Sequence, residues 1–244
     1  MPIRNPFRQH FLFQRLVPLS RSAHVGLGIN LSTGLAPYEW HLVPIVLSEI
    51  QNVAAFYPIV VTKEQELQLC ALVGLHPTRS LFLERDGRWA KDHYVPLYLR
   101  QTPFFVKQQV PNHPPTLHID IDDPAVDDRF ADKIILSGGI NPRLNDRVAA
   151  ASALAAEQGR TASFLNSLVS ANVLRNLSAF RRYSATSVAN DLLGIWPPPG
   201  GAALATNTAD SVRHCAASLG RIVSLRALQE ARYHAEEQMD RPDL

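Results

Sequence analysis

FYPIVVTKEQELQLCALVGLHPTRSLFLERDGRWAKDHYVPLYLRQTPFF, residues 56–105, is the stretch whose pattern decides the fold. Apolar, β-branched or alternating runs occur in it at residues 58–62, 67–73 and 80–84, and such runs are typical of strands. Asp86-Gly87 follows the third run, and glycine supplies the positive φ that tight turns require. The pattern predicts an antiparallel meander with one buried face.

The residues before this stretch predict two more strands and a helix. Residues 10–18 alternate loosely and could form an edge strand, and residues 38–47 read as another strand. Pro44 favours an edge position or a bulge for the second of these, because proline lacks the N–H that a central strand needs. Ser48 is the expected N-cap of a helix that ends before Pro58.

After the central stretch, strands give way to helices. Tyr94–Thr102 is predicted as a short helix, and strands follow at residues 104–108 and 117–121. The acidic run DIDDPAVDD, residues 120–128, suits a solvated linker or loop. An extended piece is expected at residues 188–196. Further helices are predicted at residues 148–158 with Gly159 as C-cap, from Thr161 or Ser163 onward, and at residues 208–219 and 222–238.

These elements predict an α+β fold. We expect an antiparallel, β-rich N-terminal part over residues 1–122, packed with a mainly helical C-terminal part over residues 123–244. The sequence leaves open whether the two parts share one core as a continuous domain.

Composition limits the classes of function. The 244 residues carry a formal net charge of +2, and no Lys/Arg run with interleaved aromatics occurs, so we expect no nucleic-acid partner. No window approaches the ~20 apolar residues of a spanning helix. The arginines near the N-terminus interrupt any signal-like apolar run. The expected protein is soluble and cytoplasmic, although export without a signal peptide stays open. Cys70 and Cys215 are expected to be reduced thiols.

His118-Ile119-Asp120 is the sharpest chemical pattern in the chain. On a strand, residues two apart face the same side, so His118 and Asp120 could share a metal ion. With His214 as a third ligand, the set would match a non-haem iron site. The alternative interpretation is a strand with alternating polar residues and no metal.

A second constellation surrounds the Asp86-Gly87 turn. Its members are Asp86, Arg88, Trp89, Tyr94 and Arg100. Aromatic rings beside guanidinium groups could form a stacking pocket for a ligand. The alternative is that the turn and the aromatic rings serve only the fold.

The central stretch resembles the SapC family of bacterial proteins, which is named for a surface-layer gene locus. The residues that carry the resemblance, in this order and spacing, are Tyr57-Pro58-Ile59-Val60, Ala71-Leu72-Val73-Gly74-Leu75, Leu81-Phe82, Asp86-Gly87-Arg88-Trp89, Tyr94-Val95-Pro96, Arg100 and Pro103-Phe104. The resemblance implies a bacterial protein linked to surface layers or uptake systems, and it supplies no catalytic residues.

We therefore expect an accessory or binding protein of the SapC type, without a cofactor, whose partner is a protein or a small molecule. No nucleophile elbow, P-loop or dinucleotide fingerprint occurs. The alternative from another class is a 2-oxo-acid-dependent iron oxygenase that uses His118, Asp120 and His214. A third hypothesis is an interaction subunit that docks through its C-terminal helices. The sequence leaves the oligomeric state open.

Overall fold

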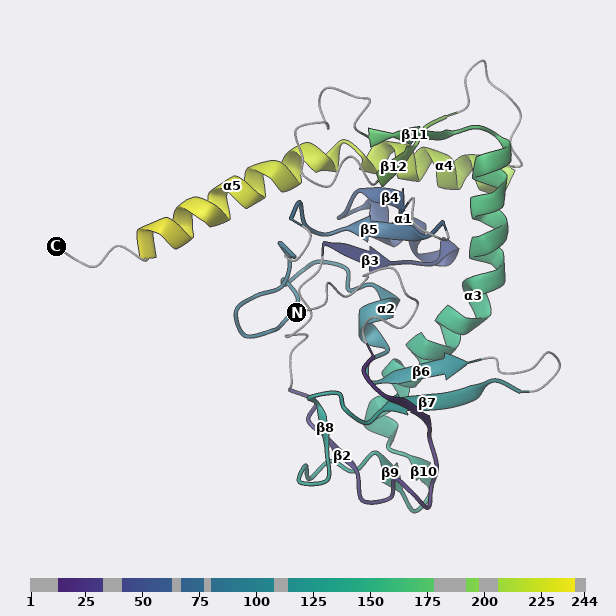
Figure 1. Ribbon diagram of the computed structural model, residues 1–244, viewed down its shortest axis with the longest axis vertical. Coiled ribbons are helices and arrows are strands. Elements are labelled where there is room, and N and C mark those ends of the chain that lie inside the picture. Colours follow the sequence, from purple (N-terminus) through teal and green to yellow (C-terminus); the bar gives the residue numbers. More distant parts are fainter. Residues whose placement is uncertain are drawn as a thin grey trace. The chain divides into compact units, whose positions relative to one another are not determined.

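The computed structural model describes residues 13–32, 41–62, 67–76, 80–107, 114–177, 192–197 and 206–239. The fold is α+β, as predicted: antiparallel sheets dominate the N-terminal half and helices the C-terminal half. The chain forms two compact units that alternate along the sequence (Figure 1). Unit 1 contains residues 1–38, 84–89 and 95–159, and unit 2 contains residues 39–83, 90–94 and 160–244.

Unit 1 is built on a three-stranded antiparallel sheet with the order β1-β7-β6. Its strands are β1 (Leu16–Pro18), β7 (Thr116–Asp120) and β6 (Phe104–Lys107). In the register, Leu16 lies opposite Asp120 and Phe105 opposite His118. The central strand is therefore β7, which carries the His118-Ile119-Asp120 pattern.

Two short strand pairs and helical segments complete unit 1. The strand pairs are β2 (Gly28–Ile29) with β8 (Val126–Asp127), and β9 (Ile135–Leu136) with β10 (Gly139–Ile140). The helical segments are α2 (Leu97–Arg100), η2 (Pro142–Leu144) and the first half of α3 (Asn145–Ser170).

The core of unit 1 includes part of the acidic run. Ala125 and Val126 are buried in one cluster with Phe104, Ile119 and Leu144. Residues 121–125 form turns, so the run contains the expected loop, but burial of Ala125 and Val126 shows that it is not solvated throughout. Val126 anchors β8, and burying a valine side chain is worth about 1.5–3 kcal/mol.

Unit 2 is built on a five-stranded antiparallel sheet with the order β11-β12-β4-β5-β3. Its strands are β11 (Leu174–Asn176), β12 (Leu192–Ile195), β4 (Ile59–Thr62), β5 (Leu69–Leu72) and β3 (Leu42–Pro44). β3 is an edge strand, which is the position that Pro44 predicted. β4 and β5 confirm the first two predicted strands of the central stretch, whereas residues 80–84 form no named strand.

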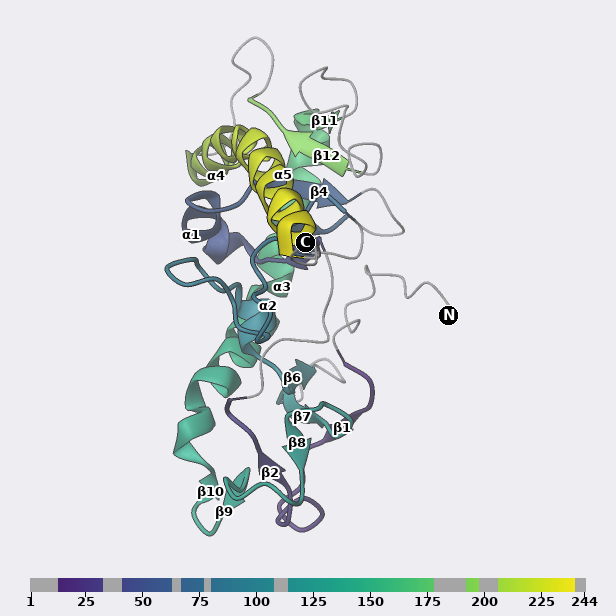
Figure 2. The same ribbon diagram turned by 90° about the vertical axis from the view of Figure 1, so that its left-hand side faces the viewer.

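Helices α1 (Ile50–Ala54) and α4 (Thr206–Ser218) lie on one side of this sheet (Figure 2). Unit 2 also contains η1 (Leu47–Glu49), the second half of α3 and α5 (Arg221–Met239). α4 packs against α1, β4 and β12. The Ser218 hydroxyl accepts a hydrogen bond from the Ile59 N–H at 2.9 Å, which fixes α4 to the start of β4.

Two predicted helix boundaries were wrong. Ser48 lies inside η1 and caps nothing; instead the buried Glu49 carboxylate accepts from the Val46 N–H at 3.1 Å. Gly159 does not end a helix, because α3 continues through it to Ser170. Thr161 is consequently inside α3, where its hydroxyl accepts from the Leu47 N–H at 3.0 Å.

Candidate functional site

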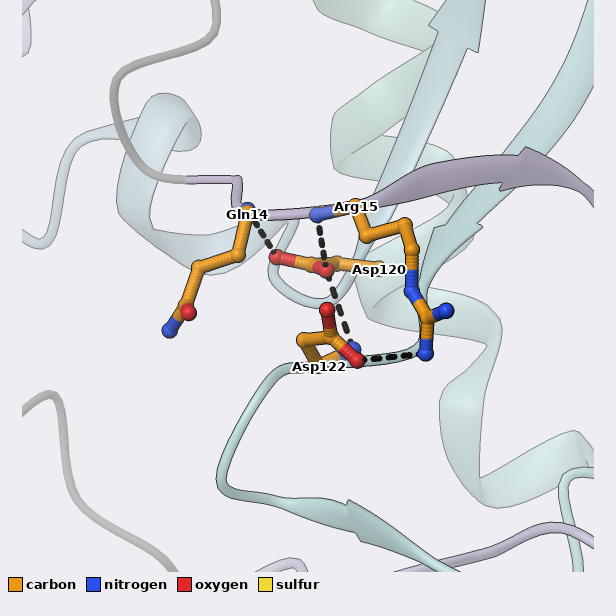
Figure 3. A network of polar contacts seen from close by, with 4 residues as sticks. All are labelled: Gln14, Arg15, Asp120 and Asp122. Carbon is orange, nitrogen blue, oxygen red and sulfur yellow. Dashed lines mark hydrogen bonds and ion pairs between the residues drawn. The ribbon is translucent and has the colours of Figure 1, made fainter.

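Asp120 is the centre of the polar network in unit 1. It is the last residue of β7, and its side chain is fully buried. One carboxylate oxygen accepts from the Gln14 N–H at 2.7 Å. The other accepts from the N–H groups of Arg15 at 2.8 Å and Asp122 at 3.1 Å (Figure 3). Three backbone donors therefore compensate the buried charge and tie the start of β1 to the end of β7.

An ion pair extends this network to the surface. The Arg15 guanidinium lies 2.7 Å from the Asp122 carboxylate, and the two side chains are 61% and 42% exposed. Such an exposed pair contributes little to stability. The buried Asp120 carboxylate, rather than the ion pair, fastens the two strands.

The metal hypothesis places His118 beside Asp120, and the strand does put both on one face. His118 is buried, and its Nδ1 lies 3.0 Å from the Thr116 carbonyl oxygen. A metal ion at Asp120 would have to compete with the three N–H donors that the carboxylate already accepts.

The third predicted ligand belongs to a different part of the fold. His214 lies on α4 in unit 2 and is exposed. Across the described ranges, no three or more His, Cys, Asp and Glu side chains are grouped as metal ligands. The triad of His118, Asp120 and His214 thus stays a prediction, and its test is given in the Discussion.

The second predicted constellation is split between the units. Asp86, Arg88 and Trp89 lie together on the turn in unit 1. Gly87 has a φ of 79°, as the turn prediction requires, and its N–H donates to the Glu84 carbonyl at 3.0 Å. The Asp86 carboxylate accepts from the Arg88 N–H at 3.0 Å. The turn is therefore closed by its own backbone and by the Asp86 side chain.

The side chains of this turn face solvent to different degrees. The Asp86 and Arg88 side chains are 57% and 74% exposed, and they form a loose ion pair of 3.5 Å. Trp89 is partly buried. Arg100, the last residue of α2 in the same unit, is also exposed. Three cationic or aromatic side chains of the constellation are thus accessible, at least in part, on unit 1.

Tyr94 serves a buried network in unit 2. Its hydroxyl donates to the Glu49 carboxylate at 3.0 Å, and its carbonyl accepts from the Tyr57 hydroxyl at 2.7 Å. Two other rings lie next to the Tyr57 ring. The centroid of the Phe82 ring is 4.8 Å from the Tyr57 centroid, and that of the His93 ring is 6.4 Å from it. These contacts give Tyr94 a structural role in joining residues 90–94 to η1.

Sequence reasoning missed Glu49 as a member of this network. Glu49 is only 2% exposed, and it directly follows Ser48, the residue that the sequence predicts as an N-cap. The available signal was a single carboxylate within an apolar stretch, VPIVLSEIQNV, where burial requires hydrogen-bond donors.

Arg147 on α3 was also missed. Its guanidinium donates to the Thr102 carbonyl, and burial lowers its pKa while the charge of Asp123 acts in the opposite direction. Nothing in the Ala-rich helical pattern distinguishes this arginine from an exposed one, so the sequence carried no signal for it.

The comparison with family models gives one match. A family model described as SapC matches residues 19–193, which is more than half of the 244 residues. The chain belongs to the SapC family. The comparisons with curated proteins and with solved structures found no match.

Among the residues that the structure describes, no helix is both long and apolar enough for a transmembrane span.

Proposed function

We propose that this SapC-family protein is an accessory binding protein that works with a partner in the bacterial surface layer or in an uptake system. Membership of the family over residues 19–193 supports the link. The observation that carries the binding role is the closed turn at residues 84–89, which presents charged and aromatic side chains to solvent.

The turn has the chemistry of a recognition element. Tryptophan and arginine are enriched among the residues that dominate binding energy in protein interfaces. Here Trp89 is partly exposed and Arg88 is largely exposed, next to the carboxylate of Asp86. Because the turn is held by its own hydrogen bonds, little conformational entropy would be lost when a partner binds.

The proposal gives the five predicted residues two kinds of role. Asp86, Arg88, Trp89 and Arg100 would contact the partner, since all four lie in unit 1 and are at least partly exposed. Tyr94 would act indirectly, by holding residues 90–94 through Glu49.

Co-sedimentation with surface-layer material isolated from the native cell tests this function. The wild-type protein should sediment with the layer in a saturable manner. Arg88→Ala and Trp89→Ala should each weaken binding about tenfold or more, which corresponds to about 1.4 kcal/mol. Lys91→Ala is the matched control, because Lys91 is exposed two residues beyond the turn and belongs to unit 2.

Two results would contradict the proposal. If the wild-type protein stays in the supernatant at every concentration of surface-layer material, the link to the layer is wrong. If it sediments and both turn variants bind as tightly as Lys91→Ala, the turn is not the recognition element. Circular dichroism serves as the control that each variant keeps its fold.

A further inference from the structure

A cavity of about 380 Å³ lies in unit 1, away from the turn described above. This volume falls within the range of about 300–1,000 Å³ that small-molecule sites occupy. Three segments that are distant in sequence line it: the residues after β1, the start of β7 and the hairpin β9–β10. The lining residues are Leu19, Arg21, Pro114, Pro115, Thr116, Leu117, Ile135, Gly139 and Ile140.

Part of the cavity wall is apolar, and this part is held by the core. Leu19, Leu117 and Ile140 are partly buried side chains that pack against the core cluster of unit 1, and Ile135 belongs to that cluster. The Leu19 N–H donates to the Leu117 carbonyl at 2.8 Å, which fixes one wall to the next. An apolar chain or ring placed here would therefore be removed from water on a preformed surface.

The β9–β10 hairpin, which supplies Ile135, Gly139 and Ile140 to the lining, is anchored at its base. The Asn141 N–H donates to the Ile134 carbonyl at 2.9 Å, and the Asn141 amide donates to the Lys133 carbonyl at 2.9 Å. Arg143, which follows the hairpin in sequence, forms an ion pair with Asp132, which precedes it. The β9–β10 wall thus holds its position through contacts outside the cavity.

Among the described residues, Arg21 is the one charged residue that lines the cavity. Its guanidinium lies close to Gly139, so that a Cβ built on this glycine would be 3.3 Å from Arg21 Nη2. No acidic side chain of the described residues forms an ion pair with Arg21. A guanidinium matches the geometry of a carboxylate, with two parallel N–H···O bonds.

We propose that this cavity binds a small amphipathic carboxylate, with the apolar part against Leu19, Leu117 and Ile140 and the carboxylate on Arg21. Charge complementarity selects the anion, and the apolar walls select a hydrocarbon chain or ring behind it. The site is separate from the turn at residues 84–89, so this inference does not depend on the proposed function.

Titration calorimetry with octanoate as the probe tests the proposal. We expect saturable binding of octanoate to the full-length protein, and at least tenfold weaker binding of octanamide, which has the same chain without the charge. Arg21→Ala should weaken octanoate binding at least tenfold, whereas Arg21→Lys should weaken it less, because the charge stays and the bidentate geometry is lost. Ile140→Glu should abolish binding by placing a carboxylate at the apolar wall.

Arg129→Ala is the matched control, since Arg129 is an exposed arginine of unit 1 whose ion pair with Asp127 lies outside the cavity. It should bind octanoate as the wild-type protein does. Three results would each overturn the proposal, and the first two concern octanoate alone: no binding at millimolar concentration, or equal affinity for Arg21→Ala and Arg129→Ala. Equal affinity for octanoate and octanamide would show an apolar site without anion recognition, and would also overturn it.

Discussion

Asp120 illustrates how one buried carboxylate can fasten a strand whose own pairing is short. β1 has three residues and lies at the edge of the three-stranded sheet, where it pairs with β7. The carboxylate adds hydrogen bonds to the N–H groups of Gln14 and Arg15, just before that strand begins. Hydrogen bonds to a charged group are worth about 1.5–3 kcal/mol each, more than those between neutral groups.

We predict that Asp120→Ala destabilises unit 1 by about 3 kcal/mol or more, because it removes three hydrogen bonds that the buried carboxylate accepts. Amide hydrogen exchange should accelerate at Gln14, Arg15 and along β1. Asp122→Asn is the control, since Asp122 is exposed and its ion pair contributes within about 0.5 kcal/mol. Similar exchange rates in the two variants would contradict a structural role for Asp120.

The two cysteines lead to a prediction on pH. Both Cys70 and Cys215 are free and buried, as expected from the sequence, and burial raises the pKa of each thiol. Above about pH 8.5 the unfolded chain releases thiol protons that the folded chain keeps. The unfolded state then binds fewer protons, so stability should fall with rising pH, by up to about 1.4 kcal/mol per unit for each thiol.

Denaturant unfolding of the wild-type protein and of Cys70→Ala, between pH 7 and pH 10, measures this effect. The variant should be less stable at pH 7, because it lacks the buried sulfur atom, but its stability should decline less steeply at alkaline pH. Parallel pH profiles for the two proteins would show that the Cys70 thiol does not contribute in this way.

At the scale of single residues, only local contacts could be predicted from the sequence. The Asp86-Gly87 turn was predicted correctly, because the residues that close it lie within five positions of one another. The role of Tyr94 was not, because its partner Glu49 lies 45 positions away in the chain. Likewise, Gln14 and Arg15 are separated from Asp120 by more than 100 positions.

Helices and strands differ in how far their own amino-acid sequence determines where they begin and end. The β-branched run of β4 predicted a strand, and a strand is present. Gly159 favoured a helix end, yet α3 continues through it, because the helix packs on both sides of this position, with Leu154 and Phe164 buried. Tertiary packing outweighed the roughly 1 kcal/mol that glycine costs in a helix.

This position gives an element-scale prediction. A Cβ at Gly159 would meet no atom within 4 Å, and the residue is exposed within α3. Gly159→Ala should therefore stabilise the protein by about 0.5–1 kcal/mol. Gly28→Ala should do the opposite, since a Cβ there would lie 2.2 Å from the Phe130 carbonyl oxygen. Thermal unfolding tests whether Gly159→Ala is more stable and Gly28→Ala less stable than the wild-type protein. A destabilised Gly159→Ala would show that the helix is strained at this point.

At the scale of the whole molecule, each of the two compact units takes residues from both halves of the chain. The five-stranded sheet of unit 2 takes β3, β4 and β5 from the first half of the chain, and β11 and β12 from the second. Periodicity predicts strands but not their partners, so the pairing of β4 with β12 could not be inferred from the sequence.

We predict that the fragments 1–122 and 123–244 do not fold separately. Each would lack strands or helices that its sheet or core requires, and β4 would lose β12 along one edge. Amide NMR spectra of the separate fragments should show little dispersion, and mixing them should restore part of it. Cooperative unfolding of either fragment alone would support the sequential division at residue 122 instead.

The measurement that distinguishes binding from oxygenase chemistry most directly is the iron content of the purified protein. The protein is prepared without a metal-binding tag, incubated anaerobically with Fe(II), desalted and analysed for metal. If the protein functions by binding and Asp120 serves the fold, iron should remain far below one atom per chain. Near-stoichiometric iron that is lost in a folded His118→Ala variant would contradict this and would establish the His118–Asp120 pair as a metal site.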